Sequence, residues 1–162
     1  DGNYPYTINP GGPNHEELVS LIGIYDYMNS LYNHHFNDKD LSIRDKINKI
    51  NNLICLHEEE IAQPILSYLD SEKNFNLIGQ KTINGKNRAP TISFTNKKKS
   101  SKEVSRILVS NNIATRNDNF YAWRCLSALG INNNDGVVRV SMTHYNSLED
   151  TERLINSLKN NF

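Results

Sequence analysis

The stretch at residues 137–143 reads VVRVSMT, and its alternating side chains make it the clearest strand in this sequence. Successive side chains of an extended strand point to opposite faces of a sheet. Val138, Val140 and Met142 therefore share one face, which we expect to pack on the core. Arg139 lies on the opposite face, where a rigid strand would hold its guanidinium in place. A guanidinium held in this way binds a carboxylate through two parallel hydrogen bonds, so Arg139 is a candidate binding residue.

Further strands are predicted on the N-terminal side of this one. The segments FNLIGQ and RAPTISFT flank an Asn84-Gly85 turn signal, which predicts a hairpin over residues 75–95. The segment NIATR, which ends at Arg116, is predicted to be another short strand. We expect all of these strands to join one sheet.

Helices are predicted between and after the strands. Ser100 with Glu103, and Ser147 with Asp150, have the spacing of a capping box, in which each residue hydrogen-bonds to the backbone of the other. Each pair precedes apolar residues at helical spacing. Asp118 is predicted to cap a further helix that follows the NIATR strand.

The first half of the chain carries two long helical patterns. After a loop over residues 1–13, Asn14 is placed to cap the first helix. The second pattern covers residues 39–72 and contains Pro64, which predicts a kink or two helices that share one axis. The sequence as a whole predicts an α+β fold, in which long helices precede a small, mainly antiparallel sheet that is covered by helices.

Composition excludes several classes of function. The 162 residues carry 18 basic and 18 acidic side chains, and this balance argues against a nucleic-acid partner. The basic run KKKSSK also lacks the interleaved aromatic residues of a single-strand binder. No apolar run approaches the length of about 20 residues that spans a bilayer, so no membrane partner is expected.

The cysteines and histidines predict no disulfide scaffold and no metal site. The two cysteines, Cys55 and Cys125, are too few for a disulfide framework and fit a reducing, cytoplasmic compartment. Both are predicted to pack in helices rather than to act as nucleophiles. The five histidines do not have the spacing of metal ligands.

Three further positions are candidates for binding. Arg116 ends a predicted strand and could point to the same place as Arg139. Gly12 and Asn14 belong to the segment PGGPNHE, whose glycines and helix N-terminus could bind a phosphate. Each has an ordinary alternative: a solvated surface arginine for Arg139, a strand-end cation for Arg116, and a flexible entry turn for the glycine-rich segment.

Five segments together resemble a known family. They are, in order, GGPNHEELVSLIGIYDYM, HEEEIAQPILSYL, RAPTISFT, IATRNDNFYA and VVRVSMTHYNSLEDTERL. This series resembles the C-terminal part of class V aminotransferase-like enzymes that use pyridoxal 5′-phosphate (PLP), in the cysteine desulfurase and selenocysteine lyase group. The resemblance implies a PLP-dependent transferase of fold type I. Residues 1–35 would end its large domain, and residues 36–162 would form its C-terminal small domain.

The resemblance also implies roles for individual residues. Arg139 matches the arginine that binds the carboxylate of the amino-acid substrate, and Arg116 matches the arginine that opens the active-site loop. Gly12 and Asn14 match a turn that reaches the cofactor phosphate of the neighbouring subunit in a homodimer. The threonine of that turn is replaced by Gly12, and the persulfide-forming cysteine of true desulfurases aligns near Tyr121.

The family's cofactor-binding residues match no part of this sequence. The Schiff-base lysine, the aspartate under the pyridine nitrogen and the ring-stacking residue would all lie upstream of Asp1. The resemblance implies that PLP binds the full-length protein, which acts on a cysteine-like amino acid, and that this chain alone binds no PLP, contains no catalytic residue and is inactive. One alternative is a free-standing, non-enzymatic α+β interaction module, and another is a small RNA-binding domain.

Overall fold

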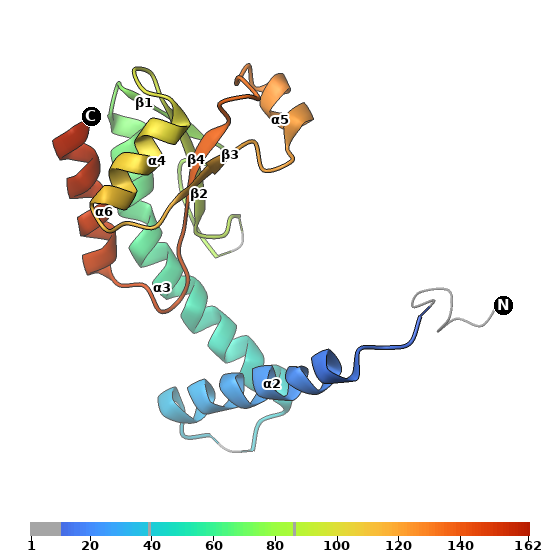
Figure 1. Cartoon of the computed structure of the whole chain (residues 1–162). Helices are drawn as coiled ribbons and strands as arrows, with labels where there is room; N and C mark the ends of the chain where they lie inside the picture. Colours follow the sequence, from blue (N-terminus) through green and yellow to red (C-terminus); the bar gives the residue numbers. More distant parts are fainter. Residues whose placement is uncertain (1–10, 39, 86) are drawn as a thin grey trace. The chain divides into compact units, whose positions relative to one another are not determined.

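The computed structural model describes residues 11–38, 40–85 and 87–162 (Figure 1). The chain forms two compact units that divide between Leu53 and Ile54, inside helix α3 (Ile43–Ser71). The predicted boundary between residues 35 and 36 concerns the domains of a whole enzyme, and it stays a prediction.

The first unit contains helix α2 (His15–His35), which Asn14 caps as predicted. The Asn14 Oδ1 atom accepts a hydrogen bond of 3.2 Å from the backbone N–H of Glu17. Of the α2 residues, all of which are described, Tyr32 alone is buried. Its hydroxyl donates a hydrogen bond of 2.7 Å to the carbonyl oxygen of Asp38, which fixes the end of the helix to the segment that follows. Residues 1–10 of the predicted loop lie outside the described residues.

Helix α3 is a single helix that continues through Pro64, so the two-helix alternative is wrong. Pro64 is exposed, whereas Ile61, Ala62, Ile65 and Leu66 around it are buried. Burial of these apolar side chains on the other side of the helix offsets the backbone hydrogen bond that proline cannot donate.

The second unit contains a four-stranded antiparallel sheet with the strand order β1-β2-β4-β3. Phe75 lies opposite Asn96 in the first pair of strands, which confirms the predicted hairpin. Its connection is longer than a tight turn, and within it the Asn87 N–H donates to the carbonyl oxygen of Asn84 over 2.9 Å. The strands are β1 (Phe75–Ile78), β2 (Thr91–Asn96), β3 (Arg116–Asp118) and β4 (Val137–Ser141).

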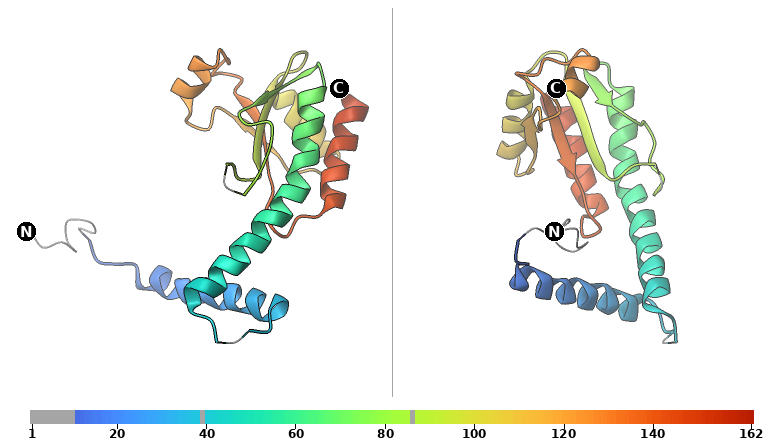
Figure 2. Two further views of the ribbon diagram at one scale, coloured as in Figure 1. Left: turned by 180° about the vertical axis from the view of Figure 1, so that it is seen from behind. Right: turned by 90° about the vertical axis from the view of Figure 1, so that its right-hand side faces the viewer.

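Helices cover one face of this sheet (Figure 2). Side chains of α3, α4 (Ser101–Ser110) and α6 (Leu148–Asn161) join alternate strand residues in one core. Both predicted capping boxes are present at the starts of α4 and α6. The predicted core face of β4 is confirmed, because Val138 and Val140 are buried in this cluster and Met142 packs against it.

The region between α4 and β4 differs from the prediction. β3 begins at Arg116 rather than ending there, because the backbone N–H groups of Asn112 and Ile113 still close the end of α4. Asp118 caps no helix, since it pairs with Val137 inside the sheet.

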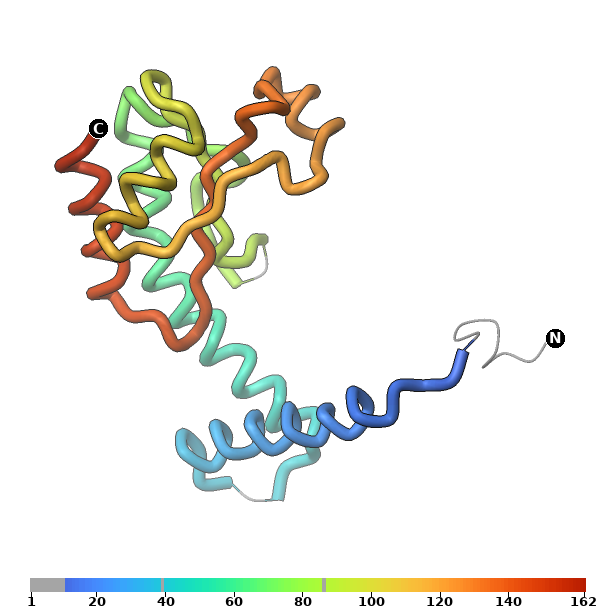
Figure 3. Tube along the Cα trace, in the orientation of Figure 1, coloured from blue at the N-terminus to red at the C-terminus, as the bar shows by residue number. Residues whose placement is uncertain are grey.

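Helix α5 (Trp123–Ala128) consequently begins later than predicted and has no side-chain cap. Phe120 and Tyr121 have φ values of 51° and 60°, in the left-handed region, where a right-handed helix cannot form. The tube in Figure 3 shows this segment in orange, leaving the sheet after β3 and returning to it at β4.

Candidate functional site

The face of the sheet opposite the helices is mainly polar, and it is called the polar face below. Alternation along each strand places here the side chains that do not enter the core. The polar residues of this face are Asn76 of β1, Thr91, Ser93 and Thr95 of β2, Arg116 and Asp118 of β3, and Arg139 and Ser141 of β4. Two apolar residues share the face: Ile78, which pairs with Ser93, and the buried Val137, which pairs with Asp118.

The two arginines predicted from the sequence lie directly opposite each other on this face. Arg116 pairs with Arg139 across β3 and β4, and Arg139 pairs with Ser93 across β4 and β2. Like charges directly opposite each other destabilise a sheet. Among the ion pairs of the described residues, none involves either arginine. An anion bound at this row would remove the repulsion and supply the missing hydrogen-bond acceptors.

The Arg139 side chain is half-buried and stacked rather than freely solvated. Its guanidinium carbon lies 4.0 Å from the centre of the Phe120 ring, the geometry of a cation–π contact. Its Nε atom is buried and has no hydrogen-bond partner in the described part of the chain. A buried N–H without an acceptor costs about 1–3 kcal/mol, so the surroundings of Arg139 include a group that lowers the stability of the sheet.

The turn after β3 determines where Phe120 lies. Asn119 holds this turn, because its Oδ1 atom accepts a 3.0 Å hydrogen bond from the N–H of Tyr121 and its Nδ2 atom donates to the carbonyl oxygen of Asn133 over 3.3 Å. Gly136, with φ of 70°, passes so close to Asp118 that a Cβ atom would overlap the Asp118 carbonyl group. Sequence reasoning missed the roles of Phe120, Asn119 and Gly136.

The glycine-rich turn that was predicted to bind a phosphate belongs to the first unit, whereas Arg116 and Arg139 belong to the second unit. Asn14 already uses its side-chain oxygen to cap α2. Gly12 is exposed, and a Cβ atom there would meet nothing within 4 Å, so no crowding requires glycine. Glu16 and Glu17 add negative charge to the first turn of α2, where a phosphate would bind. The contact of this turn with a cofactor phosphate stays a prediction, and it would be made by backbone N–H groups.

The polar face also lacks the amine that PLP requires. The cofactor is held through a lysine side chain, and no residue of β2, β3 or β4 is a lysine. The strands of this face therefore supply no side chain to which the cofactor could be attached.

The two cysteines differ from each other in exposure. Cys125 lies on α5 and is exposed, so its predicted burial is wrong: α5 buries only Leu126. Cys55 is half-buried in α3, and its Sγ atom lies 3.8 Å from the carbonyl oxygen of Gly85. Tyr121, near which the resemblance would place the family's persulfide cysteine, is 98% exposed.

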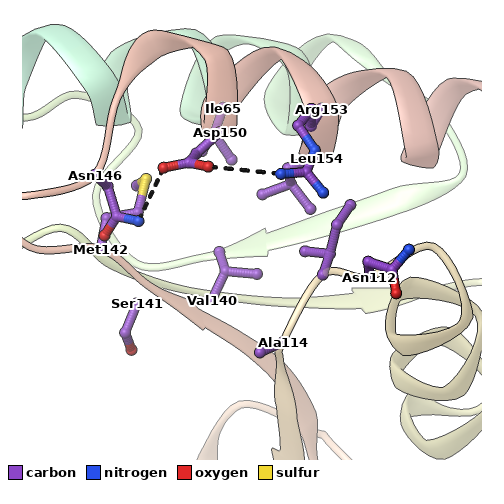
Figure 4. A pocket seen from close by; sticks show the side chains of 11 residues that line it. Ile65, Asn112, Ala114, Val140, Ser141, Met142, Asn146, Asp150, Arg153 and Leu154 are labelled. Atoms are coloured by element: carbon purple, nitrogen blue, oxygen red, sulfur yellow. Dashed lines mark hydrogen bonds and ion pairs between the residues drawn. The ribbon is translucent and has the colours of Figure 1, made fainter.

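A separate cavity of about 270 Å³ lies on the helix-covered side, between the end of β4 and α6 (Figure 4). Its floor is apolar, and its rim carries Asp150 and Arg153. The Asp150 carboxylate already accepts hydrogen bonds from the Asn146 side chain and the Ser147 N–H, which hold the pKa of Asp150 below its usual value. Because these polar groups complete the cap of α6, the cavity is a weaker candidate than the arginine row.

The other titratable cluster lies where α3 meets residues 144–146. Burial raises the pKa of Glu58, and the nearby His144 and His57 partly offset this effect. The His57 Nε2 atom lies 2.8 Å from the carbonyl oxygen of Asn146. No group of three or more potential metal ligands is present in the described ranges, and no helix within them is long and apolar enough to cross a membrane.

Comparison with known proteins gives the same family as the sequence motifs. The family model for class V aminotransferases matches residues 44–154, a range that includes both arginines of the polar face. The chain belongs to the class V aminotransferase family. The matched range excludes Gly12 and Asn14.

The individual relatives are longer than this chain. The aminotransferase-like protein FGM3 of Gibberella zeae is 32% identical over 108 residues, which are 65% of this chain and 27% of that protein. A cysteine desulfurase of Thermococcus onnurineus NA1 is 26% identical, with a TM-score of 0.59 over 73% of this chain and 29% of that structure. The cysteine desulfurase CsdA of Escherichia coli shares the fold at 17% identity, with a TM-score of 0.64 over 93% of this chain and 31% of that structure. The chain thus spans less than a third of each relative.

These similarities confirm the predicted family and the predicted α+β fold of fold type I PLP enzymes.

Proposed function

We propose that this chain is the C-terminal part of a PLP-dependent, cysteine desulfurase-like enzyme and that it binds the carboxylate of the amino-acid substrate. The observation that carries the proposal is the pair of cross-strand arginines, Arg116 and Arg139, without an acidic partner among the described residues. A sheet that places two cations opposite each other is most stable when an anion lies between them.

Each residue of the row has a chemical role in this proposal. Arg139 presents a planar guanidinium that can form two parallel hydrogen bonds to a carboxylate. Arg116 adds a second positive charge from the neighbouring strand, and Ser93 adds a hydroxyl donor on the other side. PLP, when bound by the whole protein, supplies the electron sink for chemistry at the substrate's α-carbon. The residues of the polar face bind and orient the substrate, and they do not hold the cofactor.

Several predictions from the resemblance remain to be tested. They are the contact of Gly12 and Asn14 with the phosphate of a neighbouring subunit, the homodimer that this contact requires, the preference for a cysteine-like substrate, and the cytoplasmic location. We include them in the proposed function, together with the absence of PLP binding and of activity in this chain alone.

The proposal is tested in the whole protein by substitution of Arg139. Arg139→Ala should raise the KM for the amino acid about ten- to a hundredfold, because hydrogen bonds to charged groups contribute about 1.5–3 kcal/mol. Arg139→Lys should recover only part of this loss, since an ammonium cannot form the two parallel bonds. PLP absorbance should be unchanged.

Arg106→Ala is the matched control, because Arg106 is an exposed arginine of α4, on the helix-covered side. It should leave KM unchanged. If Arg139→Ala behaves in the same way as Arg106→Ala, the substrate site is elsewhere and the interaction-module alternative gains support.

A further inference from the structure

We propose that Phe120 is a positioning residue for Arg139: its ring restrains the guanidinium and shields it on one side, so that the carboxylate approaches from elsewhere. This inference rests on the proposed function of Arg139. Its structural part, the restraint of one side chain by the other, is measurable without any ligand.

Arg139 has few contacts that could restrain its side chain. The guanidinium carbon of Arg139 lies 4.0 Å from the centre of the Phe120 ring, and no ion pair among the described residues involves Arg139. The guanidinium makes no hydrogen bond to another described residue, and the Nε atom is buried. A long side chain without such bonds samples many rotamers, so the ring supplies the restraint. Because the guanidinium carbon lies only 4.0 Å over the centre of the ring, the ring shields the guanidinium on that side, and an anion must approach from elsewhere.

The backbone of the turn after β3 determines where the Phe120 ring lies. Phe120 has a φ of 51°, a conformation that is uncommon for a bulky side chain. The hydrogen bonds of Asn119 and the close approach of Gly136 hold the turn in this conformation. The same turn brings the ring onto Arg139. Backbone strain of this kind is typical of functional sites.

The neighbouring residue provides a matched control. Tyr121 is also aromatic and has a φ of 60°, but its side chain is 98% exposed and has no contact with Arg139. The same substitution at both positions therefore changes the backbone in the same way and removes the stacked ring in only one case. Asparagine is suitable because it tolerates the left-handed region, so both variants should fold.

The first measurement is the heteronuclear NOE of the Arg139 Nε–Hε group in the ¹⁵N-labelled chain, assigned by its loss in Arg139→Lys. We expect a rigid value in the unsubstituted chain and in Tyr121→Asn. Phe120→Asn should lower it to the value of exposed Arg106, and Phe120→Trp should restore it, because tryptophan stacks at least as well on a cation. A rigid Arg139 in Phe120→Asn would overturn the proposal.

The second measurement separates this inference from the proposed function. L-Alanine is titrated into each variant, with L-alaninamide, which lacks the carboxylate, as the negative control. Phe120→Asn should weaken L-alanine binding about three- to tenfold, and Tyr121→Asn should leave it unchanged. If Arg139→Ala removes binding but Phe120→Asn does not weaken it, this inference is wrong and the proposed function stands. If Arg139→Ala leaves L-alanine binding intact, the proposed function is wrong. In that case the NOE values still show whether Phe120 restrains the Arg139 side chain.

Discussion

Val140 and Arg139 are neighbours in β4, but they belong to faces of the sheet that are organised in different ways. Val140 is 4% exposed and lies in a core built from three helices and the strands. Arg139 lies on the other face, opposite Arg116. Its Nε atom is buried and has no hydrogen-bond partner among the described residues. The covered face is arranged for stability. The polar face includes an arrangement that costs stability, which is typical of a site that is completed by a ligand.

The largest expected change in stability comes from a substitution on the face that the helices cover. Phe94 is fully buried, and its ring meets that of Phe75 edge to face at 5.6 Å. Phe94→Ala should lower the free energy of unfolding by about 3–5 kcal/mol, because it leaves a cavity in the core. Arg139→Ala should change it by less than about 1 kcal/mol. Urea denaturation of both variants makes the comparison, and equal losses would show that Arg139 is a structural residue.

The next effect concerns the turn that supports the polar face. Gly136→Ala should destabilise the chain by about 1–3 kcal/mol, because it combines a left-handed φ with an overlap of Cβ and the Asp118 carbonyl group. Gly130→Ala is the control, since Gly130 also has a φ of 70° but has open space around a Cβ atom. Its loss should be smaller, and the Arg139 Nε–Hε resonance should shift only in Gly136→Ala. Equal losses of stability and equal shifts of the Arg139 resonance in Gly136→Ala and Gly130→Ala would show that the close approach of Gly136 to Asp118 does not affect the turn.

A smaller effect concerns the cap of α6, on the covered side. Hydrogen bonds to Ser147 and Asn146 hold the pKa of Asp150 below its ordinary value of 3.8. The stabilisation that they supply is therefore fully present above pH 3.8 and is lost as the pH falls through the lower pKa of the folded state. Asp150→Asn should cost about 0.3–1 kcal/mol at pH 7. The free energies of unfolding of the unsubstituted chain and of Asp150→Asn, measured between pH 2 and 7, should become equal at the acidic end. A difference that does not change with pH would show that the Asp150 carboxylate does not stabilise the cap.

The smallest effect has the opposite sign. Arg116→Ala should raise the free energy of unfolding by about 0.2–1 kcal/mol at low ionic strength, because it removes the like charge opposite Arg139. The gain should shrink as salt is added, since Arg116 is exposed and its charge is screened. Thermal unfolding at several salt concentrations provides the measurement. A loss of stability on removal of Arg116 would show that the pair is already compensated within the chain.

Local signals in the sequence predicted most of the fold. The capping boxes at Ser100 and Ser147 and the alternation around Arg139 depend on residues a few positions apart, and each was confirmed. The sequence also placed Arg139 off the core face. That Arg116 lies directly opposite it depends on strand register, which the alternation of a single strand does not determine.

The turn over residues 119–122 could not be predicted in the same way. The sequence NDNFYAW contains a good helix cap followed by apolar residues, so local propensity favours a helix from Asp118. The structure adopts left-handed backbone at Phe120 and Tyr121 because Asp118 pairs in the sheet and Gly136 passes against it from a segment 18 positions away. Tertiary contacts of this kind override local propensity. An Asn119 beside two aromatic residues was the available signal, because asparagine stabilises turns through its own side chain.

A titration of the ¹⁵N-labelled chain with L-alanine and L-alaninamide tests whether Arg116 and Arg139 together form a carboxylate site. We predict that L-alanine, but not L-alaninamide, shifts the backbone amides of Ser93, Arg116 and Arg139 in a saturable way. Arg139→Ala should abolish these shifts, and Arg116→Ala should weaken them. Equal shifts from both compounds, or shifts that persist in Arg139→Ala, would show that Arg116 and Arg139 do not form a carboxylate site.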